Sequence, residues 1–232
     1  MTEKEWLACN EPNLMLAHLA DHELTARKQR LFDCACVRRI WHLLLDERGR
    51  EAVEVAERYA DGAASLDEVR EAQGIALAAA DAQATLYLPG VPNSFSVLSA
   101  AAGTAWEFRS GADPLQHVAN TIAWEGLAEN GASERRAARA KLADEQKRQA
   151  TLLIEVVGNP FRPIVPDRDW FSFTVLALAK SIYDDRAFDR LPILADALEE
   201  AGCTNAEILE HLRSGGEHVR GCWALDLVLG KT

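Results

Sequence analysis

The sequence predicts an all-α protein, a multi-helix bundle with orthogonal or irregular packing, about nine to ten helices and no significant sheet. Three observations support this fold class. Apolar residues recur every three or four positions along nearly the whole chain, which is the spacing of one helix face. No run of β-branched residues alternates with polar residues, as a half-buried strand requires. Capping sequences and glycine or proline stops divide the chain into segments of helical length.

The helical spacing predicts ten segments. They cover residues 25–46, 50–60, 66–86, 94–108, 114–129, 133–157, 171–183, 190–201, 204–213 and 218–229. The first segment is the clearest, because Leu31, Cys34, Trp41 and Leu45 share one side while Arg38 falls elsewhere. This segment is therefore expected to face the core.

Short capping sequences mark several of the helix starts. Ser65 and Glu68 have the spacing of a capping box, in which each side chain bonds the backbone amide of the other residue. Thr204 and Glu207 repeat this spacing further along the chain. The other predicted N-caps are Asp113, which precedes Pro114, and Ser133.

Two proline-containing stretches interrupt the helical pattern. Residues 89–93 are predicted to form an ordered loop, because proline lacks an amide donor and restricts the residue before it. Residues 158–169 contain three prolines and mark a boundary between an N-terminal helical region, 1–157, and a C-terminal region, 158–232. Phe161 and Ile164 are too apolar for a flexible tether, so the two regions are expected to pack as one compact unit.

Composition places the chain among ordinary globular proteins. Of its 232 residues, 48% are hydrophobic and 26% are charged, which is enough apolar material for a core without disulfides or metal. The net charge of −11 repels phosphate backbones and disfavours nucleic acid as a partner. Residues 1–5 are charged where a signal peptide would be apolar, and the apolar run at 74–80 ends at Asp81. A soluble cytoplasmic protein with no membrane partner is expected, with its five cysteines as free thiols.

Two groups of basic residues depart locally from the acidic balance. The first comprises Arg27, Lys28, Arg30, Arg38 and Arg39; the second comprises Arg135, Arg136, Arg139, Lys141, Lys147 and Arg148. Acidic residues are interleaved with the second group, which is typical of a solvated helix face. The alternative is a nucleic-acid binder that uses this basic face.

Four residues near the C-terminus could hold a metal ion. They are Cys203, His211, His218 and Cys222. If 218–229 is a helix, His218 and Cys222 lie four residues apart on one face, where two side chains can bind one zinc ion. The alternative, which we prefer from the sequence, is that Cys222 belongs to the core, since free cysteine is among the most buried residue types. No metal ligand and no cofactor is therefore assigned from the sequence.

An acidic group, Asp184, Asp185, Asp189 and Asp196, allows two interpretations. These carboxylates could bind a divalent metal or act as an acid and base pair. Helix capping and ion pairs with Arg186 and Arg190 account for them more simply, because Asp189 precedes a predicted helix.

The common catalytic motifs do not occur. The chain has no phosphate-binding glycine loop, no His-Glu-x-x-His, no Gly-x-Ser-x-Gly and no Cys-x-x-Cys. Nothing in the sequence therefore identifies an enzyme.

Several blocks resemble an uncharacterised α-helical family of environmental bacteria. They are Gly-Asn-Pro-Phe-Arg-Pro at 158–163, Ile-Tyr-Asp-Asp-Arg-Ala-Phe-Asp-Arg-Leu-Pro-Ile-Leu-Ala-Asp-Ala-Leu-Glu-Glu-Ala-Gly-Cys at 182–203, His-Val-Arg-Gly-Cys-Trp at 218–223, and the segment 28–41. The resemblance implies a shared fold. No activity is known for that family, so it implies no catalytic residues.

The function expected from the sequence is a non-enzymatic helical module that binds another protein or regulates it. Phe161, Arg162 and Trp170 are the candidate contact residues, because these residue types are enriched at binding hot spots. A zinc protein or metal-dependent enzyme that uses the C-terminal cysteines and histidines is the alternative, and a nucleic-acid binder is the second alternative. The sequence is also compatible with a homo-oligomer.

Overall fold

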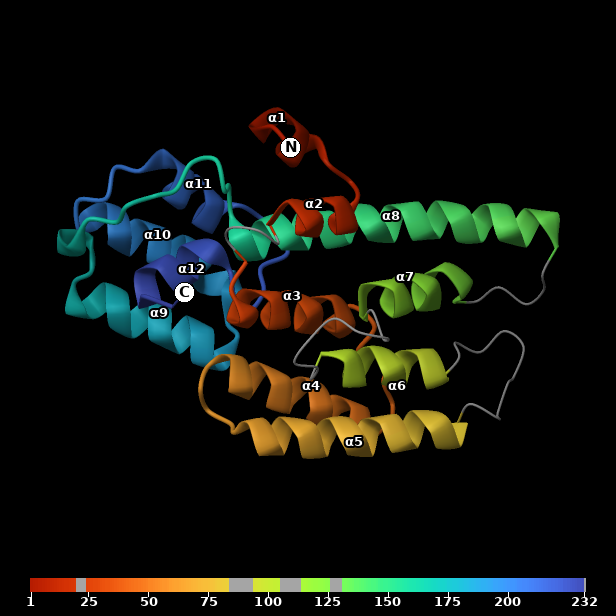
Figure 1. The fold of residues 1–232 in the computed structure, drawn as a ribbon. Helices are drawn as coiled ribbons and strands as arrows, with labels where there is room; N and C mark the ends of the chain where they lie inside the picture. The colour runs from red at the N-terminus through yellow and green to blue at the C-terminus, as the bar shows by residue number, and fades with distance from the viewer. Residues whose placement is uncertain (20–23, 84–93, 105–113, 126–130, 232) are drawn as a thin grey trace. The chain divides into compact units, whose positions relative to one another are not determined.

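The computed structural model is all-α throughout the residues that it describes (Figure 1), which are all except 20–23, 84–93, 105–113, 126–130 and 232. These residues form twelve α-helices and two short 3₁₀ helices, with no strand among them. The all-α fold class is thus confirmed. The helix count exceeds the expected nine to ten because of two short N-terminal helices, α1 (Glu3–Ala8) and α2 (Pro12–Leu19).

The chain divides into two compact units, and each is described by itself. One consists of Ala8–Thr151; the other combines Met1–Leu7 with Leu152–Thr232. The division therefore falls inside the long helix α8 (Ala132–Val157), and not at residue 158. The prolines after residue 158 show where a helix ends, but they do not show where one compact unit ends. The helix continues without interruption from one unit into the other.

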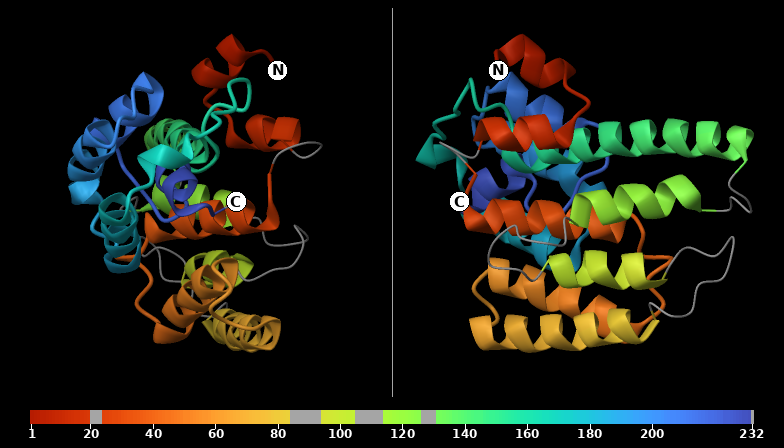
Figure 2. Two further views of the ribbon diagram at one scale, coloured as in Figure 1. Left: turned by 90° about the vertical axis from the view of Figure 1, so that its left-hand side faces the viewer. Right: turned by 45° about the vertical axis from the view of Figure 1, so that its right-hand side comes forward.

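Helices α3 to α7 form the core of the Ala8–Thr151 unit. They are α3 (Ala26–Arg38), α4 (Glu47–Ala60), α5 (Leu66–Gln83), α6 (Ser94–Gly103) and α7 (Pro114–Trp124). Helix α4 lies beside α5 and α6, as both ribbon views show (Figures 1 and 2), and α3 contacts α4, α6 and α7. Cys34, Val53 and Leu98 are buried together at this junction.

The first predicted helix is shorter than its apolar pattern suggested. Helix α3 ends at Arg38, and the next residues form turns in which the Ile40 amide bonds the Val37 carbonyl at 3.0 Å. These turns bury Ile40 and redirect the chain so that Leu45, expected on the buried side, is 79% exposed. Periodicity alone could not show this, because the apolar spacing continues through the turns.

Local capping was predicted with mixed success. The Ser65 and Glu68 box is present: the Ser65 amide donates to the Glu68 carboxylate at 2.7 Å, and the Glu68 amide donates to the Ser65 hydroxyl at 3.2 Å. Ser133 is not a cap, because α8 already begins at Ala132 and the Ser133 hydroxyl donates to Glu134. Asp113 and the loop at 89–93 lie outside the described residues.

The first basic group is largely paired inside the Ala8–Thr151 unit. Arg27 pairs with Asp61 at 3.0 Å, Arg38 with Glu57 at 2.6 Å and Arg39 with Glu145 at 2.8 Å. In the second group, Lys141 donates to the Glu125 carbonyl at 2.6 Å, while the other five residues are exposed on α8. The first group is therefore structural, and the second forms the solvated helix face that its interleaved acids predicted.

The other unit is built from the end of α8 and the C-terminal helices. These are α9 (Phe173–Asp185), α10 (Leu191–Glu200), α11 (Ala206–Arg213) and α12 (Trp223–Leu229), with 3₁₀ helices η1 (Arg168–Trp170) and η2 (Phe188–Arg190). Their buried core includes Ile182, Leu194, Cys203, Leu212 and Cys222. The helix predicted over 218–229 begins only at Trp223, and Asn205, not Thr204, caps α11 by accepting from the Ile208 amide at 3.1 Å.

The acidic group is spread over separate ion pairs in this unit. Asp184 pairs with Lys180 within α9, and Asp196 pairs with Arg213 at 2.7 Å. Asp189 lies inside η2, whose N-cap position is Ala187, so it does not cap α10 as expected. These carboxylates do not form a shared site in the described structure.

No helix in the described part of the chain is long and apolar enough to cross a membrane.

The Arg39–Glu145 pair gives a stability prediction. Two hydrogen bonds of 2.8 and 2.9 Å join the guanidinium to a carboxylate that is 1% exposed. Glu145→Ala should lower the free energy of unfolding by about 3–5 kcal/mol, because it leaves a guanidinium that is only 12% exposed without this partner. Chemical denaturation measures the change. Glu47→Ala, which removes an 81% exposed carboxylate from Arg50, is the control and should cost less than about 1 kcal/mol. Equal losses in the two variants would contradict the prediction.

Candidate metal centre

Four side chains converge within the C-terminal unit. They are Glu155 from α8, His211 from α11, and His218 and Cys222 from the segment that joins α11 to α12. One ligand atom from each residue lies within 4.8 Å of all the others. The shortest separations are 2.9 Å from His218 Nδ1 to Glu155 Oε1, and 3.3 Å from His211 Nε2 to both Glu155 Oε2 and Cys222 Sγ.

The backbone around Glu155 explains how it reaches this position. Glu155 follows buried Leu152 and Leu153 near the end of α8, so its carboxylate enters the unit with the apolar face of the helix. Helix α8 ends at Val157 and is followed by Gly158, whose φ of +78° is a conformation that glycine adopts without strain. A Cβ at this position would lie 3.1 Å from the Trp223 ring, so the absence of a side chain also lets α12 begin close to α8.

The connection between α11 and α12 places the other ligands. Asn205 fixes the start of α11, and His211 follows in the last turn of that helix. Gly221, with a φ of +92°, allows the turn in which the Cys222 amide donates to the Val219 carbonyl at 3.0 Å. His218 and Cys222 are therefore brought together by a loop and not by one helix face.

The hydrogen bonds of His218 define which ring nitrogen faces the centre. Its Nε2 lies 3.2 Å from the Ser214 carbonyl oxygen, which can only accept, so Nε2 carries a proton. Its Nδ1 then faces the Glu155 carboxylate at 2.9 Å. That contact needs either a second proton on the ring or a cation shared by the two groups, because two lone pairs would otherwise repel. Metal-binding histidines have this same outer hydrogen bond to a carbonyl.

The same geometry argues against a serine nucleophile. The Ser214 hydroxyl lies 3.4 Å from His218 Nε2, and His218 in turn contacts Glu155, which is the order of a Ser-His-Glu triad. A general base must present an unprotonated nitrogen to the hydroxyl. His218 Nε2 already donates to the Ser214 carbonyl, so it does not serve as that base.

The charges of the centre are strongly coupled. Burial raises the pKa of Glu155, but hydrogen bonds from His211 and His218 and their positive charge outweigh it and lower the pKa to about 2. Burial lowers the pKa of His218, but the hydrogen bond and charge of Glu155 raise it by more, so the net shift is upward. Glu155 is thus ionised at neutral pH and attracts positive charge to a largely buried position.

Cys222 is held as a neutral thiol when no cation is near. Burial raises the pKa of this thiol well above its ordinary value, and the Glu155 charge raises it further, while the Leu225 and Ala224 amides act in the opposite direction. A buried neutral thiol is a poor nucleophile. A bound metal ion would reverse this preference, because a coordinating thiol is deprotonated and its proton is released to solvent.

The donor atoms fit a zinc ion. Zinc binds nitrogen and oxygen at about 2.0–2.2 Å and sulfur at about 2.3 Å, so tetrahedral ligand atoms lie about 3.3–3.7 Å apart. The separations of 2.9 and 3.3 Å would lengthen slightly, and the longer ones, which reach up to 4.8 Å, would shorten by about 1 Å to reach these values. One carboxylate, two imidazoles and one thiolate would complete a four-coordinate shell that leaves no open position.

The sequence identified three of these four residues as candidates. Cys203 does not join them: it is 1% exposed in the same apolar core as Cys222, but it lies outside the group of converging ligand atoms. Glu155 was missed. The signal that could have revealed it is a lone carboxylate in the apolar run Leu-Leu-Ile-Glu-Val-Val at 152–157, since a charge in a buried helix end requires a partner.

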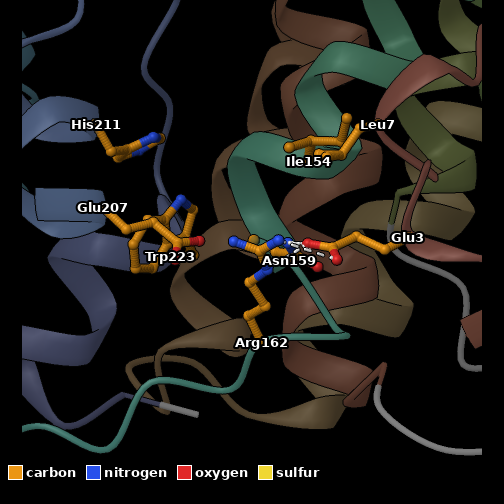
Figure 3. Close-up of a pocket in the computed structure, with 9 residues that line it drawn as sticks. Glu3, Leu7, Ile154, Asn159, Arg162, Glu207, His211 and Trp223 are labelled. Carbon is orange, nitrogen blue, oxygen red and sulfur yellow. Dashed lines mark hydrogen bonds and ion pairs between the residues drawn. The ribbon is translucent and has the colours of Figure 1, made fainter.

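A pocket of about 300 Å³ opens beside the centre (Figure 3). It is lined by Glu3, Leu7, Ile154, Gly158, Asn159, Arg162, Glu207, His211 and Trp223. Glu3 accepts a hydrogen bond from Asn159 Nδ2 at 2.7 Å and pairs with Arg162 Nε at 2.6 Å. Of the three protein-binding candidates, Arg162 lines this pocket and Phe161 is 37% exposed, whereas Trp170 packs against the core of the unit.

Comparison with known proteins assigns no family to the chain, since no family model, curated protein or solved structure matches it. The resemblance to a family of environmental bacteria therefore stays a prediction.

The Gly158 turn gives a second stability prediction. Gly158→Ala should lower the free energy of unfolding by about 1–3 kcal/mol, because an L side chain at positive φ is strained and its Cβ would press on Trp223. Thermal or chemical denaturation measures the loss. Gly74→Ala is the matched control: it lies within α5 with no neighbour within 4 Å, so alanine should be neutral or stabilising there. A neutral Gly158→Ala would show that this turn does not constrain the end of α8.

Proposed function

We propose that this chain is a zinc-binding protein in which the ion has a structural role. The ligands would be a Glu155 carboxylate oxygen, His211 Nε2, His218 Nδ1 and the Cys222 thiolate. The observation that carries the proposal is the approach of these four atoms to within 4.8 Å of one another in a largely buried position. Four donors from the protein fill a tetrahedral shell, which is typical of structural zinc sites, whereas catalytic sites keep one position for water.

The donor set favours zinc over the other common divalent ions. Magnesium and calcium prefer shells of oxygen ligands, and only one of these four residues supplies oxygen. A thiolate with two imidazoles suits zinc, and a reducing cytoplasm, where we expect this protein, would keep Cys222 available.

The structural role follows from what the ligands connect. Glu155 lies near the end of α8, His211 lies in the last turn of α11, and Cys222 is the residue before α12. A single ion would fasten these three segments together. Because the unfolded chain holds no such site, the free energy of metal binding would add to the stability of this unit.

Protein binding is the second candidate function. It is supported by the exposure of Phe161 and Arg162 on the segment that follows α8, beside a pocket with apolar walls. A structural zinc ion would be compatible with such a role, because it would hold the end of α8, from which that segment follows, in place.

The zinc proposal is tested by metal content. Protein purified without an affinity tag, or reconstituted with equimolar zinc and desalted, should hold about one zinc ion per chain by elemental analysis. Cys222→Ala and His218→Ala should each lose most of this zinc. Cys203→Ala is the matched control, because it removes another buried thiol of the same unit that lies outside the ligand set. Zinc-free wild-type protein after reconstitution would end the proposal.

Cobalt substitution tests the ligand set separately. The Co²⁺ form should show the intense visible bands of a tetrahedral ion and a near-ultraviolet band from thiolate to cobalt, because zinc sites accept Co²⁺ in the same geometry. Cys222→Ser should abolish the near-ultraviolet band, whereas Cys203→Ser should retain it. An octahedral spectrum, or a thiolate band that survives Cys222→Ser, would contradict the assignment.

A further inference from the structure

We propose that the pocket lined by Glu3, Arg162, Glu207 and His211 is the route by which the zinc ion enters and leaves, and that the Glu3–Arg162 pair controls the rate of exchange. This inference rests on the proposed zinc site and adds its access path and regulation.

His211 connects the pocket to the centre. Its side chain is 18% exposed and lines the pocket, while its Nε2 faces Glu155 and Cys222. Among the pocket-lining residues of the described structure, it is the one that belongs to the proposed ligand set. The side chains of Glu155 and His218 are 8% and 5% exposed, and Cys222 is fully buried. An ion that reaches the centre from this side therefore meets His211 first.

The charge of the pocket favours cations. Two carboxylates, Glu3 and Glu207, line it against one guanidinium, Arg162. Because Glu3 is paired with Arg162, Glu207 gives the pocket a net negative charge, which would raise the local concentration of Zn²⁺ and lower that of anions.

Helix α1 closes one side of this route. Glu3 is held by Asn159 and Arg162, and Leu7 from the same helix forms part of the wall opposite Trp223, as Figure 3 shows. Trp6, between them in sequence, is fully buried and anchors α1. The pair is exposed enough to open, since the Arg162 side chain is 66% exposed and the Glu3 side chain 29% exposed. Separation of the Glu3–Arg162 pair would widen the path without moving a proposed zinc ligand.

The Glu3–Arg162 pair should affect the rates of zinc binding and release, and not the affinity for zinc. Neither Glu3 nor Arg162 supplies a ligand of the proposed site, so the loss of their pair should speed association and dissociation together. Glu207 acts differently, because its charge attracts the incoming ion. Its removal should slow association and weaken the dependence of that rate on salt.

Stopped-flow exchange of Zn²⁺ on the full chain tests both parts. To measure release, zinc-loaded protein is mixed with a chromogenic chelator at concentrations where the rate no longer depends on the chelator. To measure association, zinc-free protein is mixed with Zn²⁺, and the same chelator reports the Zn²⁺ that remains free. Arg162→Ala should speed zinc release about two- to tenfold with an unchanged dissociation constant. Arg168→Ala, an exposed arginine of the following segment outside the pocket, is the matched control and should exchange as wild type does.

The charge of the route is tested in the same way. Glu207→Gln should slow zinc association about twofold or more at low salt, and the difference should shrink as salt is raised. Glu210→Gln removes an exposed carboxylate of the same helix that does not line the pocket, and should leave the rate unchanged.

The rival route is the exposed loop at 214–217 that precedes His218. Gly216→Ala stiffens this loop, and by our inference it should leave zinc release unchanged. A wild-type rate in Arg162→Ala, or a release rate that responds to Gly216→Ala alone, would overturn the pocket route while leaving the zinc site in place. Wild-type protein that binds no zinc would overturn the site and the route together.

Discussion

The buried carboxylate of Glu155 is the constraint on which the C-terminal unit depends. An ionised group in an apolar interior is costly unless hydrogen bonds and opposite charge surround it. His218 and His211 approach this carboxylate from two other segments, at 2.9 and 3.3 Å. The positions of both histidines therefore depend on the end of α8. Cys222 also belongs to this group, because its thiol lies 3.3 Å from His211 Nε2.

The same constraint supports the proposed metal ion over a catalytic triad. His218 Nε2 donates to the Ser214 carbonyl, which leaves Nδ1 facing the Glu155 carboxylate and no free nitrogen for a general base. A divalent cation would satisfy a carboxylate, two imidazole nitrogens and a thiolate at once. It would also favour the thiolate form of Cys222 in this buried position.

Helices and some caps could be predicted because they depend on neighbouring residues. The Ser65 and Glu68 box formed as its spacing indicated, since both bonds lie within one turn. The start of α11 was predicted one residue early, because Thr204 and Asn205 are both good caps and only the backbone conformation selects Asn205. The end of α3 was predicted too late, because burial of Ile40 in turns has the same apolar spacing as a helix.

The candidate site, like the fold, could be predicted from the sequence only in part. The sequence by itself determined that the chain is helical and that His211, His218 and Cys222 lie near one another along the backbone. Only the tertiary structure decided that they meet in space with Glu155, and that Cys203 stays in the core. The physical reason is that a ligand shell needs atoms a few ångströms apart, and that distance depends on where the folded chain places the end of α8, the last turn of α11 and the loop before α12. No spacing along the chain encodes such a distance between separate segments.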